Sequence, residues 1–288
     1  MKKTDRSSLV IFPILVLIGF LVALAGSQGG ASIAGIPVFG LSVGLAFLIQ
    51  WLVFIPAYWF QTEKFFDLTG SLTYISVIIL AVLVSPVVGG RSLLLASLVI
   101  IWAIRLGSFL FRRIQKAGKD DRFDELKPSF FRFLNVWTIQ GLWVTFTAAA
   151  ALVAITSSSR TELDAFAIVG FLVWALGFAI EVIADNQKSR FSANPDNKGK
   201  FIQTGLWSRS RHPNYFGEIT LWVGIAIIAL PALQGWQWVA MISPLFVTLL
   251  LTRVSGVPLL EKKADTKWGG QEEYENYKKR TPVLIPRL

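Results

Sequence analysis

The chain alternates between long apolar stretches and shorter polar ones. Eight apolar stretches cover residues 9–26, 33–60, 68–88, 92–111, 135–155, 163–184, 214–232 and 236–252. As helices that rise about 1.5 Å per residue, they can each cross a hydrocarbon core about 30 Å thick, the last two marginally. From Ser7 to Thr62 no residue carries a charge, which is far longer than a core helix of a soluble protein would allow. The pattern therefore predicts an all-α fold, a polytopic integral membrane bundle of about eight transmembrane helices.

We interpret residues 1–288 as a single integral membrane domain. Residues 1–60 hold two extra N-terminal spans, and residues 61–288 form the core, with polar loops at 112–134 and 185–213 and a polar tail at 253–288. The first span follows three basic residues and ends in the small-residue stretch "ALAGS", so a cleaved signal peptide is an alternative. The span is long for the apolar region of a signal peptide, and seven further spans follow. We therefore favour a retained helix.

Basic residues are divided unevenly between the two sides of the predicted bundle. If the N-terminus is cytoplasmic, the inner segments hold 25 of the 28 Lys and Arg, whereas the outer loops hold only Arg91 and Arg160. This division predicts that both termini are cytoplasmic. The net charge of +10 follows mainly from topology and does not indicate a nucleic-acid partner, since no nucleic-acid-binding module is present.

The content of cysteine and histidine limits the possible chemistry. The chain has no Cys and one His, so disulfides, thiolate catalysis and metal sites built from Cys or several His are excluded. We expect no metal. The second span carries "GLSVG", and the spacing of Gly40 and Gly44 predicts close packing of this helix against another one.

Several charged residues lie within or at the ends of apolar stretches, where insertion of a charge is unfavourable by roughly 2.5–3.5 kcal/mol. Arg105 lies in the fourth span, Glu181 and Asp185 lie one turn apart in the sixth, and Glu218 lies near the start of the seventh. One interpretation is that these residues pair with one another, for example Arg105 with Glu181. The other is a polar cavity that opens to the cytoplasm between spans four, six and seven, and we favour the latter.

The stretch "SRHPNYFGE" contains the only histidine of the chain, at the start of the seventh span. Pro213 suits the first turn of a helix, so the free N–H groups of that turn predict an anion site next to Arg211 and His212. Asn214 and Glu218 are four residues apart and share the helix face below. A capping role at the membrane interface is the alternative for His212.

Four stretches together resemble one known family. They are "FDLTGSLTYIS", "WAIRLGSFLFRRIQKAGKDDRFDE", "GLWSRSRHPNYFGEITLWVG" and "RVSGVPLLEKK" with the later "YENYKKRTPVLIP". They resemble the steroid 5-alpha-reductase superfamily, best its branch of bacterial membrane proteins. Isoprenylcysteine and phospholipid methyltransferases, which are more distant relatives, show a similar "RHP-x-Y".

The resemblance implies an NADPH-dependent reductase of a lipid carbon–carbon double bond that is conjugated to a carbonyl group. No "GxGxxG" opens a strand–helix unit, so a Rossmann site is absent. In the family, membrane helices and loops bind the cofactor. The residues implied here to bind it are Arg105, Arg113, Glu181, Asp185, Arg211, His212, Asn214, Tyr215 and Glu218.

The implied catalytic residues are Asp67, Tyr74 and Trp102. In the steroid reductases a Glu and a Tyr polarise the substrate ketone. Asp67 aligns near that Glu, but the Tyr position holds Trp102, whose indole donates a hydrogen bond and cannot deliver a proton. Either Tyr58, Tyr74 or Asp67 is the acid, or the reaction differs.

Two other functions remain open at this point. An S-adenosylmethionine-dependent methyltransferase would favour carboxylates and aromatics around a positive sulfonium. A non-catalytic membrane protein or a transporter is the third possibility, although matching halves with broken helices are absent. The expected partners are a lipid-like small molecule and membrane lipids, and the resemblance implies a bacterial inner membrane. The oligomeric state is not indicated.

Overall fold

The computed structural model describes residues 3–158 and 162–287, so Arg160 lies outside the described residues. The chain forms two compact units. The first unit comprises Met1–Ala167 and Ile228–Ser243, and the second comprises Ile168–Ile227 and Pro244–Leu288. The expectation of a single domain stays a prediction, and each unit is described by itself.

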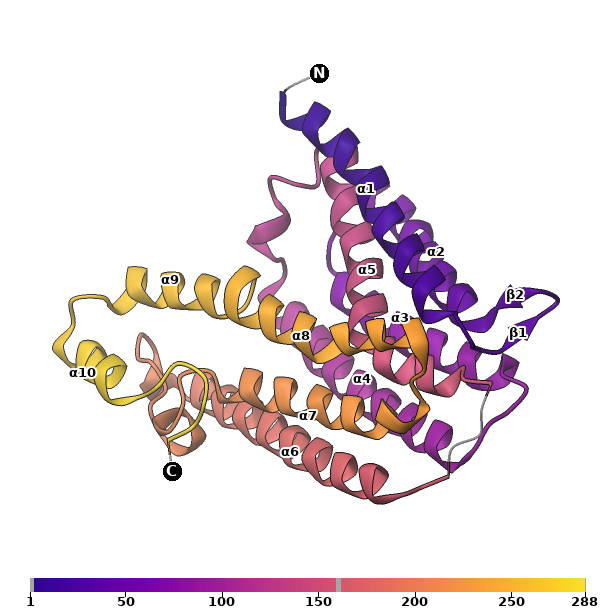
Figure 1. The fold of residues 1–288 in the computed structure, drawn as a ribbon. Coiled ribbons are helices and arrows are strands. Elements are labelled where there is room, and N and C mark those ends of the chain that lie inside the picture. Colours follow the sequence, from indigo (N-terminus) through magenta and orange to yellow (C-terminus); the bar gives the residue numbers. More distant parts are fainter. Residues whose placement is uncertain (1–2, 159–161, 288) are drawn as a thin grey trace. The chain divides into compact units, whose positions relative to one another are not determined.

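The described chain is mainly helical (Figure 1). The α-helices are α1 (Lys3–Gly26), α2 (Val38–Trp59), α3 (Phe66–Val84), α4 (Gly90–Ala117), α5 (Phe130–Ile155), α6 (Ala165–Ala193), α7 (Pro213–Ala229), α8 (Ile242–Leu249), α9 (Val257–Trp268) and α10 (Glu272–Arg280). Two short strands, β1 (Ser32–Ile33) and β2 (Ile36–Pro37), form a hairpin, a 3-10 segment (Gly235–Met241) precedes α8, and a π-helical segment (Leu250–Val254) follows it.

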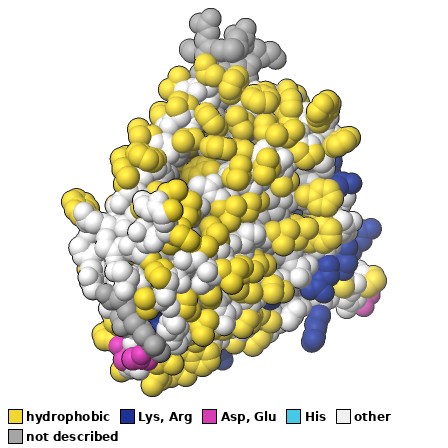
Figure 2. Space-filling model, turned by 90° about the vertical axis from the view of Figure 1, so that its right-hand side faces the viewer, with side chains coloured by type: hydrophobic (Ala, Val, Ile, Leu, Met, Phe, Trp, Pro, Cys, Tyr) yellow, Lys and Arg dark blue, Asp and Glu magenta, His cyan; other side chains and the backbone are white. Residues whose placement is uncertain are grey.

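Eight helical segments of the described chain are long and apolar enough to cross a membrane, which confirms the predicted bundle. The final segment runs from Gly235 to Trp268 and includes α8 and α9. Hydrophobic side chains cover most of the face shown in Figure 2. Leu17 of α1 and Leu172 of α6, for example, are more than half exposed. Such surfaces are stable in lipid, so the chain is a multi-pass membrane protein.

The ends of two predicted spans differ from the structure. Residues 33–37 form the hairpin and not the start of a helix, because Ala34 and Gly35 both have positive φ angles of 48° and 79°, as a tight hairpin turn requires. The fourth span continues as helix α4 to Ala117, well past the apolar stretch. Hydropathy marks where apolar residues stop, whereas a helix continues wherever its backbone hydrogen bonds are kept.

Helix α5 is the centre of the first unit and packs against α1, α2, α3 and α4. Four consecutive alanines, residues 148–151, are buried on it, and their small side chains let the neighbouring helices approach closely. Polar side chains add hydrogen bonds between helices. Gln50 Nε2 donates to Thr73 Oγ1 at 2.8 Å, and Trp51 Nε1 donates to Thr138 Oγ1 at 3.1 Å.

The predicted packing at Gly40 and Gly44 was wrong for contacts within the described chain. A Cβ atom on Gly44 would meet no atom within 4 Å, and one on Gly40 would meet only side-chain atoms, at 3.6 Å and beyond. Small residues permit close packing, but their spacing does not determine which helix face is covered.

A close helix contact of the second unit lies between α6 and α7, which run side by side in Figure 1. A Cβ atom on Gly177 would lie 2.6 Å from the Gly217 carbonyl oxygen, and one on Gly217 would lie 2.6 Å from the backbone nitrogen of Glu181. Two turns further along, a Cβ atom on Gly224 would lie 2.6 Å from the backbone nitrogen of Trp174. The backbones of α6 and α7 therefore touch, and only glycine fits at these positions.

Candidate cofactor pocket and active-site residues

The C-terminal tail of the chain fixes the segment that leads into α7. The Arg211 backbone nitrogen donates to the Pro282 carbonyl oxygen and the Arg287 nitrogen donates to the Arg209 carbonyl oxygen, both at 2.9 Å. Ser210 Oγ donates to the Leu284 carbonyl oxygen at 2.7 Å and accepts from the backbone nitrogen of His212 at 3.2 Å. Helix α7 begins at Pro213, as predicted. The loop is therefore held rigidly where the span begins.

Glu261 of α9 joins the two basic residues of the "SRHPNYFGE" stretch. Its Oε1 atom lies 2.7 Å from His212 Nε2, and its Oε2 atom lies 2.8 Å from Arg211 Nη1. Because a carboxylate only accepts, Nε2 of the imidazole carries the hydrogen. Arg211 thus pairs with a residue of the tail, which the sequence analysis did not identify as a site residue.

The imidazole of His212 is buried, and two contacts fix its orientation: Glu261 at Nε2 and Tyr215 at the ring face. Its ring stacks on Tyr215, with centroids 5.7 Å apart and an interplanar angle of 10°. Its Nδ1 atom is buried and has no hydrogen-bond partner among the described residues. A buried polar atom without a partner is unfavourable, so in the neutral imidazole this nitrogen is suited to accept a hydrogen bond from a bound molecule.

The predicted carboxylates Glu181 and Asp185 are both buried on α6, with 2% and 5% exposure. Asn214 Nδ2 of α7 donates to Asp185 Oδ1 at 3.1 Å, so the structure brings these two predicted residues together. The Oδ1 atom of Asn214 is buried and accepts no hydrogen bond from the described part of the chain. Glu218 lies one turn further along α7 and is half-buried.

A cavity of about 290 Å³ lies in the second unit next to His212 and Arg211. Six aromatic residues form part of its wall, and four lysines add positive charge beside Arg211. Its acidic lining residue is Glu261. The aromatic residues are Phe191, Phe201, Trp207, Trp268, Tyr274 and Tyr277, and the lysines are Lys188, Lys200, Lys263 and Lys267.

The aromatic wall of this cavity is one connected cluster. Phe201 contacts the rings of Trp268, Tyr274 and Tyr277 at centroid distances of 5.2–5.7 Å. Tyr277 donates its hydroxyl hydrogen to the Trp207 carbonyl oxygen at 2.7 Å. Burial raises the pKa of the Tyr277 phenol to about 12, so this donor stays protonated at neutral pH.

Two of the lysines lie over these rings. The Lys188 Nζ atom is 4.7 Å from the ring centroid of Trp207, and the Lys267 Nζ atom is 4.5 Å from that of Trp268. Such cation–π contacts hold the ammonium groups at the cavity wall. The arrangement suits a ligand that carries both a flat ring and anionic groups.

The tail residues of this cavity were not predicted from the sequence. The stretch "YENYKKRTPVLIP" contributed only to the family resemblance. Tyr274 and Tyr277 are three residues apart in a highly charged segment, and both are buried on α10. Aromatic residues at helical spacing in a polar tail are the signal that would have indicated an interior face.

The predicted catalytic residues belong to the first unit, where α3 and α4 lie antiparallel. Asp67 Oδ2 lies 3.6 Å from Arg113 Nη2, and the rings of Tyr74 and Trp102 meet edge to face, with centroids 5.1 Å apart. Between these pairs, a Cβ atom on Gly107 would lie 2.6 Å from Ser71 Cβ. The glycine lets the two helices approach and so brings the four predicted side chains together as two pairs.

Arg105, also predicted, is half-buried on α4, and its guanidinium carbon lies 5.3 Å from the ring centroid of Phe109. Tyr58, the other tyrosine considered as an acid, packs between Phe54 and Phe130 with centroids 5.6 and 5.1 Å away. It therefore belongs to an aromatic cluster of α2 and α5. Tyr74 contacts Trp102, the residue that the resemblance aligns with the family's tyrosine.

The chain is similar to proteins of several activities. It is 28% identical over 120 residues to 3-oxo-5-alpha-steroid 4-dehydrogenase 1 of Rattus norvegicus, over 41% of this chain and 40% of the relative. It is 34% identical over 143 residues to the Delta(14)-sterol reductase ERG24 of Saccharomyces cerevisiae, over 45% and 30%. It is also 33% identical over 75 residues to the probable O-methyltransferase ustE of Ustilaginoidea virens, over 26% of each chain.

These three matches span about a quarter to two-fifths of the relatives' lengths. No solved structure matches the chain significantly. A family described as "Protein of unknown function (DUF1295)" matches residues 53–281, which is well over half of the chain. The chain belongs to this family, within the steroid 5-alpha-reductase superfamily.

Proposed function

We propose that the chain is a membrane-embedded, NADPH-dependent reductase that acts on a conjugated carbon–carbon double bond of a lipid-like substrate. The observation that carries the proposal is the cavity of the second unit, in which lysines lie over aromatic rings beside His212. The similarity to a steroid dehydrogenase and a sterol reductase supports the same reaction class.

The chemistry of the cavity wall fits the adenosine-phosphate end of NADPH. The rings of Trp207 and Trp268 suit stacking on an adenine, and the ammonium groups of Lys188 and Lys267 suit its phosphates. His212 Nδ1 is available to accept a hydrogen bond from a ribose hydroxyl. At about 290 Å³, the cavity is at the lower limit for ligand sites, so it would hold one end of the dinucleotide.

NADPH, when bound, supplies a hydride. The chain itself must supply a donor for the carbonyl oxygen of the substrate, where negative charge develops. The phenol of Tyr74 is our candidate, because its ring contacts Trp102 at the position of the family's tyrosine. Asp67 is the second candidate and would have to be protonated to donate, because an ionised carboxylate only accepts. Arg113 Nη2 lies 3.6 Å from Asp67 Oδ2.

The location of the protein follows from the same proposal. With the N-terminus in the cytoplasm, the polar loops, the tail and the cavity of the second unit lie on the cytoplasmic side, where NADPH is available. We therefore place the chain in a bacterial inner membrane with both termini inside. A reporter that is active only in the periplasm should stay silent when fused after Leu288, and a signal from it would reverse this orientation.

Calorimetric titration of the detergent-purified protein tests the cofactor. We expect NADPH to bind at least roughly ten-fold more tightly than NADH, because a 2′-phosphate gains charge-assisted hydrogen bonds. The double variant Lys188→Gln/Lys267→Gln should lose most of this preference. Its control is Lys198→Gln/Lys262→Gln, which removes the same charge from exposed sites of the same unit outside the cavity. Equal affinities for NADPH and NADH would contradict a 2′-phosphate site.

A methyltransferase is the second candidate, favoured by the similarity to a probable O-methyltransferase. S-adenosylmethionine carries a positive sulfonium and no phosphate. Five basic residues and Glu261 line the cavity, so the balance of charge there disfavours this cofactor. Tight binding of S-adenosylmethionine without binding of either dinucleotide would select the methyltransferase.

A further inference from the structure

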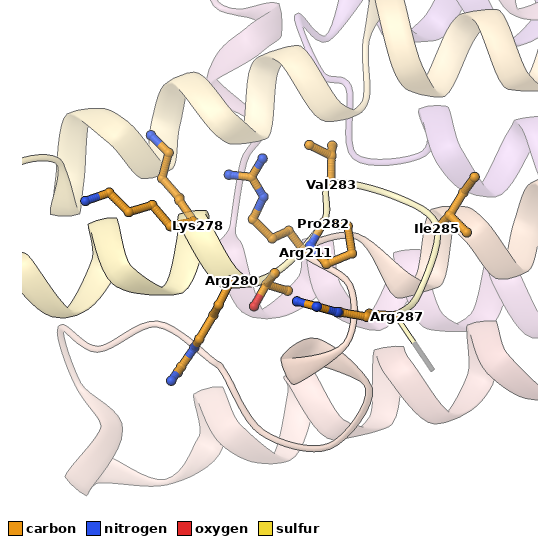
Figure 3. A pocket seen from close by; sticks show the side chains of 9 residues that line it. Arg211, Lys278, Arg280, Pro282, Val283, Ile285 and Arg287 are labelled. Carbon is orange, nitrogen blue, oxygen red and sulfur yellow. The ribbon is translucent and has the colours of Figure 1, made fainter.

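The second unit contains another cavity, of about 460 Å³, that the proposed reductase chemistry does not use. Five of its nine lining residues are basic and none is acidic. They are Arg211, Lys278, Lys279, Arg280 and Arg287, and the others are Thr281, Pro282, Val283 and Ile285. In Figure 3 the tail curves around Arg211, with Lys278 and Arg280 on one side and Ile285 and Arg287 on the other.

Acidic residues of the described chain neutralise only part of this charge. Lys278 pairs with Asp265 at 2.7 Å, and Arg211 pairs with Glu261 at 2.8 Å. Arg280 donates to the neutral amide of Gln203 at 2.6 Å. Lys279 and Arg287 have no acidic partner within residues 3–158 and 162–287. Three positive charges therefore remain for an anion.

The cavity is built before any ligand arrives. The tail is fixed to the segment before α7 by backbone hydrogen bonds at Arg211 and Arg287 and by the Ser210 hydroxyl, as described above. Arg211 is largely buried, and its Nε atom has no hydrogen-bond partner among the described residues. A preformed group of donors binds an anion without first having to order the chain.

The position of the cavity selects the kind of anion. Ile285 is 70% exposed and Val283 is 38% exposed, and both line the cavity. Arg211 stands two residues before Pro213, where an apolar span begins. Exposed apolar side chains beside basic residues at the end of a span are suited to the boundary between headgroups and acyl chains.

We propose that this cavity binds the phosphate headgroup of an anionic phospholipid from the surrounding bilayer. The basic residues hold the phosphate, and Ile285 and Val283 contact the start of the acyl chains. The site is distinct from the cofactor cavity, with which it shares only Arg211 as a lining residue. A lipid bound here would also keep the tail, and with it Glu261, in place.

The experiment measures lipid binding to the full chain in detergent by native mass spectrometry, with short-chain phosphatidylglycerol as the probe and phosphatidylcholine as the neutral reference. We expect the variant Lys279→Gln/Arg287→Gln to bind phosphatidylglycerol roughly thirty-fold more weakly, because it removes two basic residues and each one near a headgroup contributes about 1 kcal/mol. The control Lys198→Gln/Lys262→Gln should bind like the wild type. NADPH titration of the same variants should show no change, which separates this proposal from the cofactor proposal.

Three outcomes would overturn the proposal. The first is equal binding of phosphatidylglycerol to the wild type and to Lys279→Gln/Arg287→Gln. The second is an equal loss in the control pair, which would indicate attraction by net charge alone. The third is displacement of phosphatidylglycerol by free glycerol phosphate at the same concentration. That result would assign the cavity to a soluble phosphate compound.

Discussion

His212 and Glu261 meet at 2.7 Å, although they are 49 residues apart in the chain. The contact sets the tautomer of the only imidazole, because Nε2 must carry the hydrogen that the carboxylate accepts. In the neutral imidazole, Nδ1 is then left as an acceptor. A residue of α9 thereby determines which kind of group a ligand must offer to His212.

The first prediction concerns this contact. Glu261→Gln removes the negative charge that Arg211 and His212 share, and both of these side chains are largely buried. We expect the free energy of unfolding to fall by about 1–3 kcal/mol, as for other hydrogen bonds to charged groups. Thermal unfolding in detergent measures the change. Glu125→Gln, at an exposed glutamate, is the control and should unfold like the wild type.

The second prediction concerns the contact between α6 and α7. Gly217→Ala places a Cβ atom 2.6 Å from the Glu181 backbone nitrogen, and a backbone atom cannot move aside as a flexible side chain can. We expect a loss of about 3 kcal/mol in the free energy of unfolding. The control is Gly44→Ala, which has open space on α2 and should change the stability by no more than about 1 kcal/mol. Equal effects of the two variants would contradict the close contact.

The third prediction separates binding from folding at Glu218. Glu218→Gln keeps the shape of the side chain and an acceptor oxygen. If Glu218 receives the cofactor, NADPH affinity should fall by roughly ten-fold or more, or about 1.5–3 kcal/mol, while the melting temperature stays nearly unchanged. A variant that melts early and yet binds NADPH normally when folded would remove Glu218 from the site.

The fourth prediction tests Tyr74 as the proton donor. Tyr74→Phe keeps the ring that packs on Trp102 and removes only the hydroxyl. With a conjugated enone that supports NADPH oxidation, kcat should fall by roughly 10²–10⁴-fold and NADPH affinity should stay the same. Tyr58→Phe is the control, because that ring packs on Phe54 and Phe130. Unchanged turnover in Tyr74→Phe would leave Asp67 as the candidate.

Much of the fold could be predicted because spans are a local property of the sequence. The first two spans were predicted from the absence of charge between Ser7 and Thr62, and the start of α7 was predicted from Pro213. Both predictions depend only on the residues of the segment itself. Contacts between segments could not be predicted in this way. Gly40 and Gly44 have the spacing of a packing motif, but a Cβ atom on Gly44 would meet nothing within 4 Å and one on Gly40 would make only ordinary contacts with side chains. Gly217 and Gly224, in contrast, are two turns apart and touch α6.

The candidate site likewise contains residues that could be predicted from the sequence and residues that could not. Asp185 and Asn214 were chosen from the resemblance, and the structure joins them by a hydrogen bond. Glu261 was missed because its partner depends on how α9 folds back on the segment before α7. The aromatic wall was missed for the same reason, since Tyr274 and Tyr277 lie on α10, beyond the last apolar span.

The direct contact between the backbones of α6 and α7 has a consequence for engineering. Because no side chain separates the helices at Gly177 and Gly217, we expect their spacing to be independent of the residues proposed to bind the cofactor. Exchange of Asp185 and Asn214 for other polar pairs should then leave the distance between the helices unchanged. Helices α6 and α7 would then keep their positions while the residues between them are varied to alter cofactor preference. A library of variants at Asp185 and Asn214 should retain the wild-type backbone.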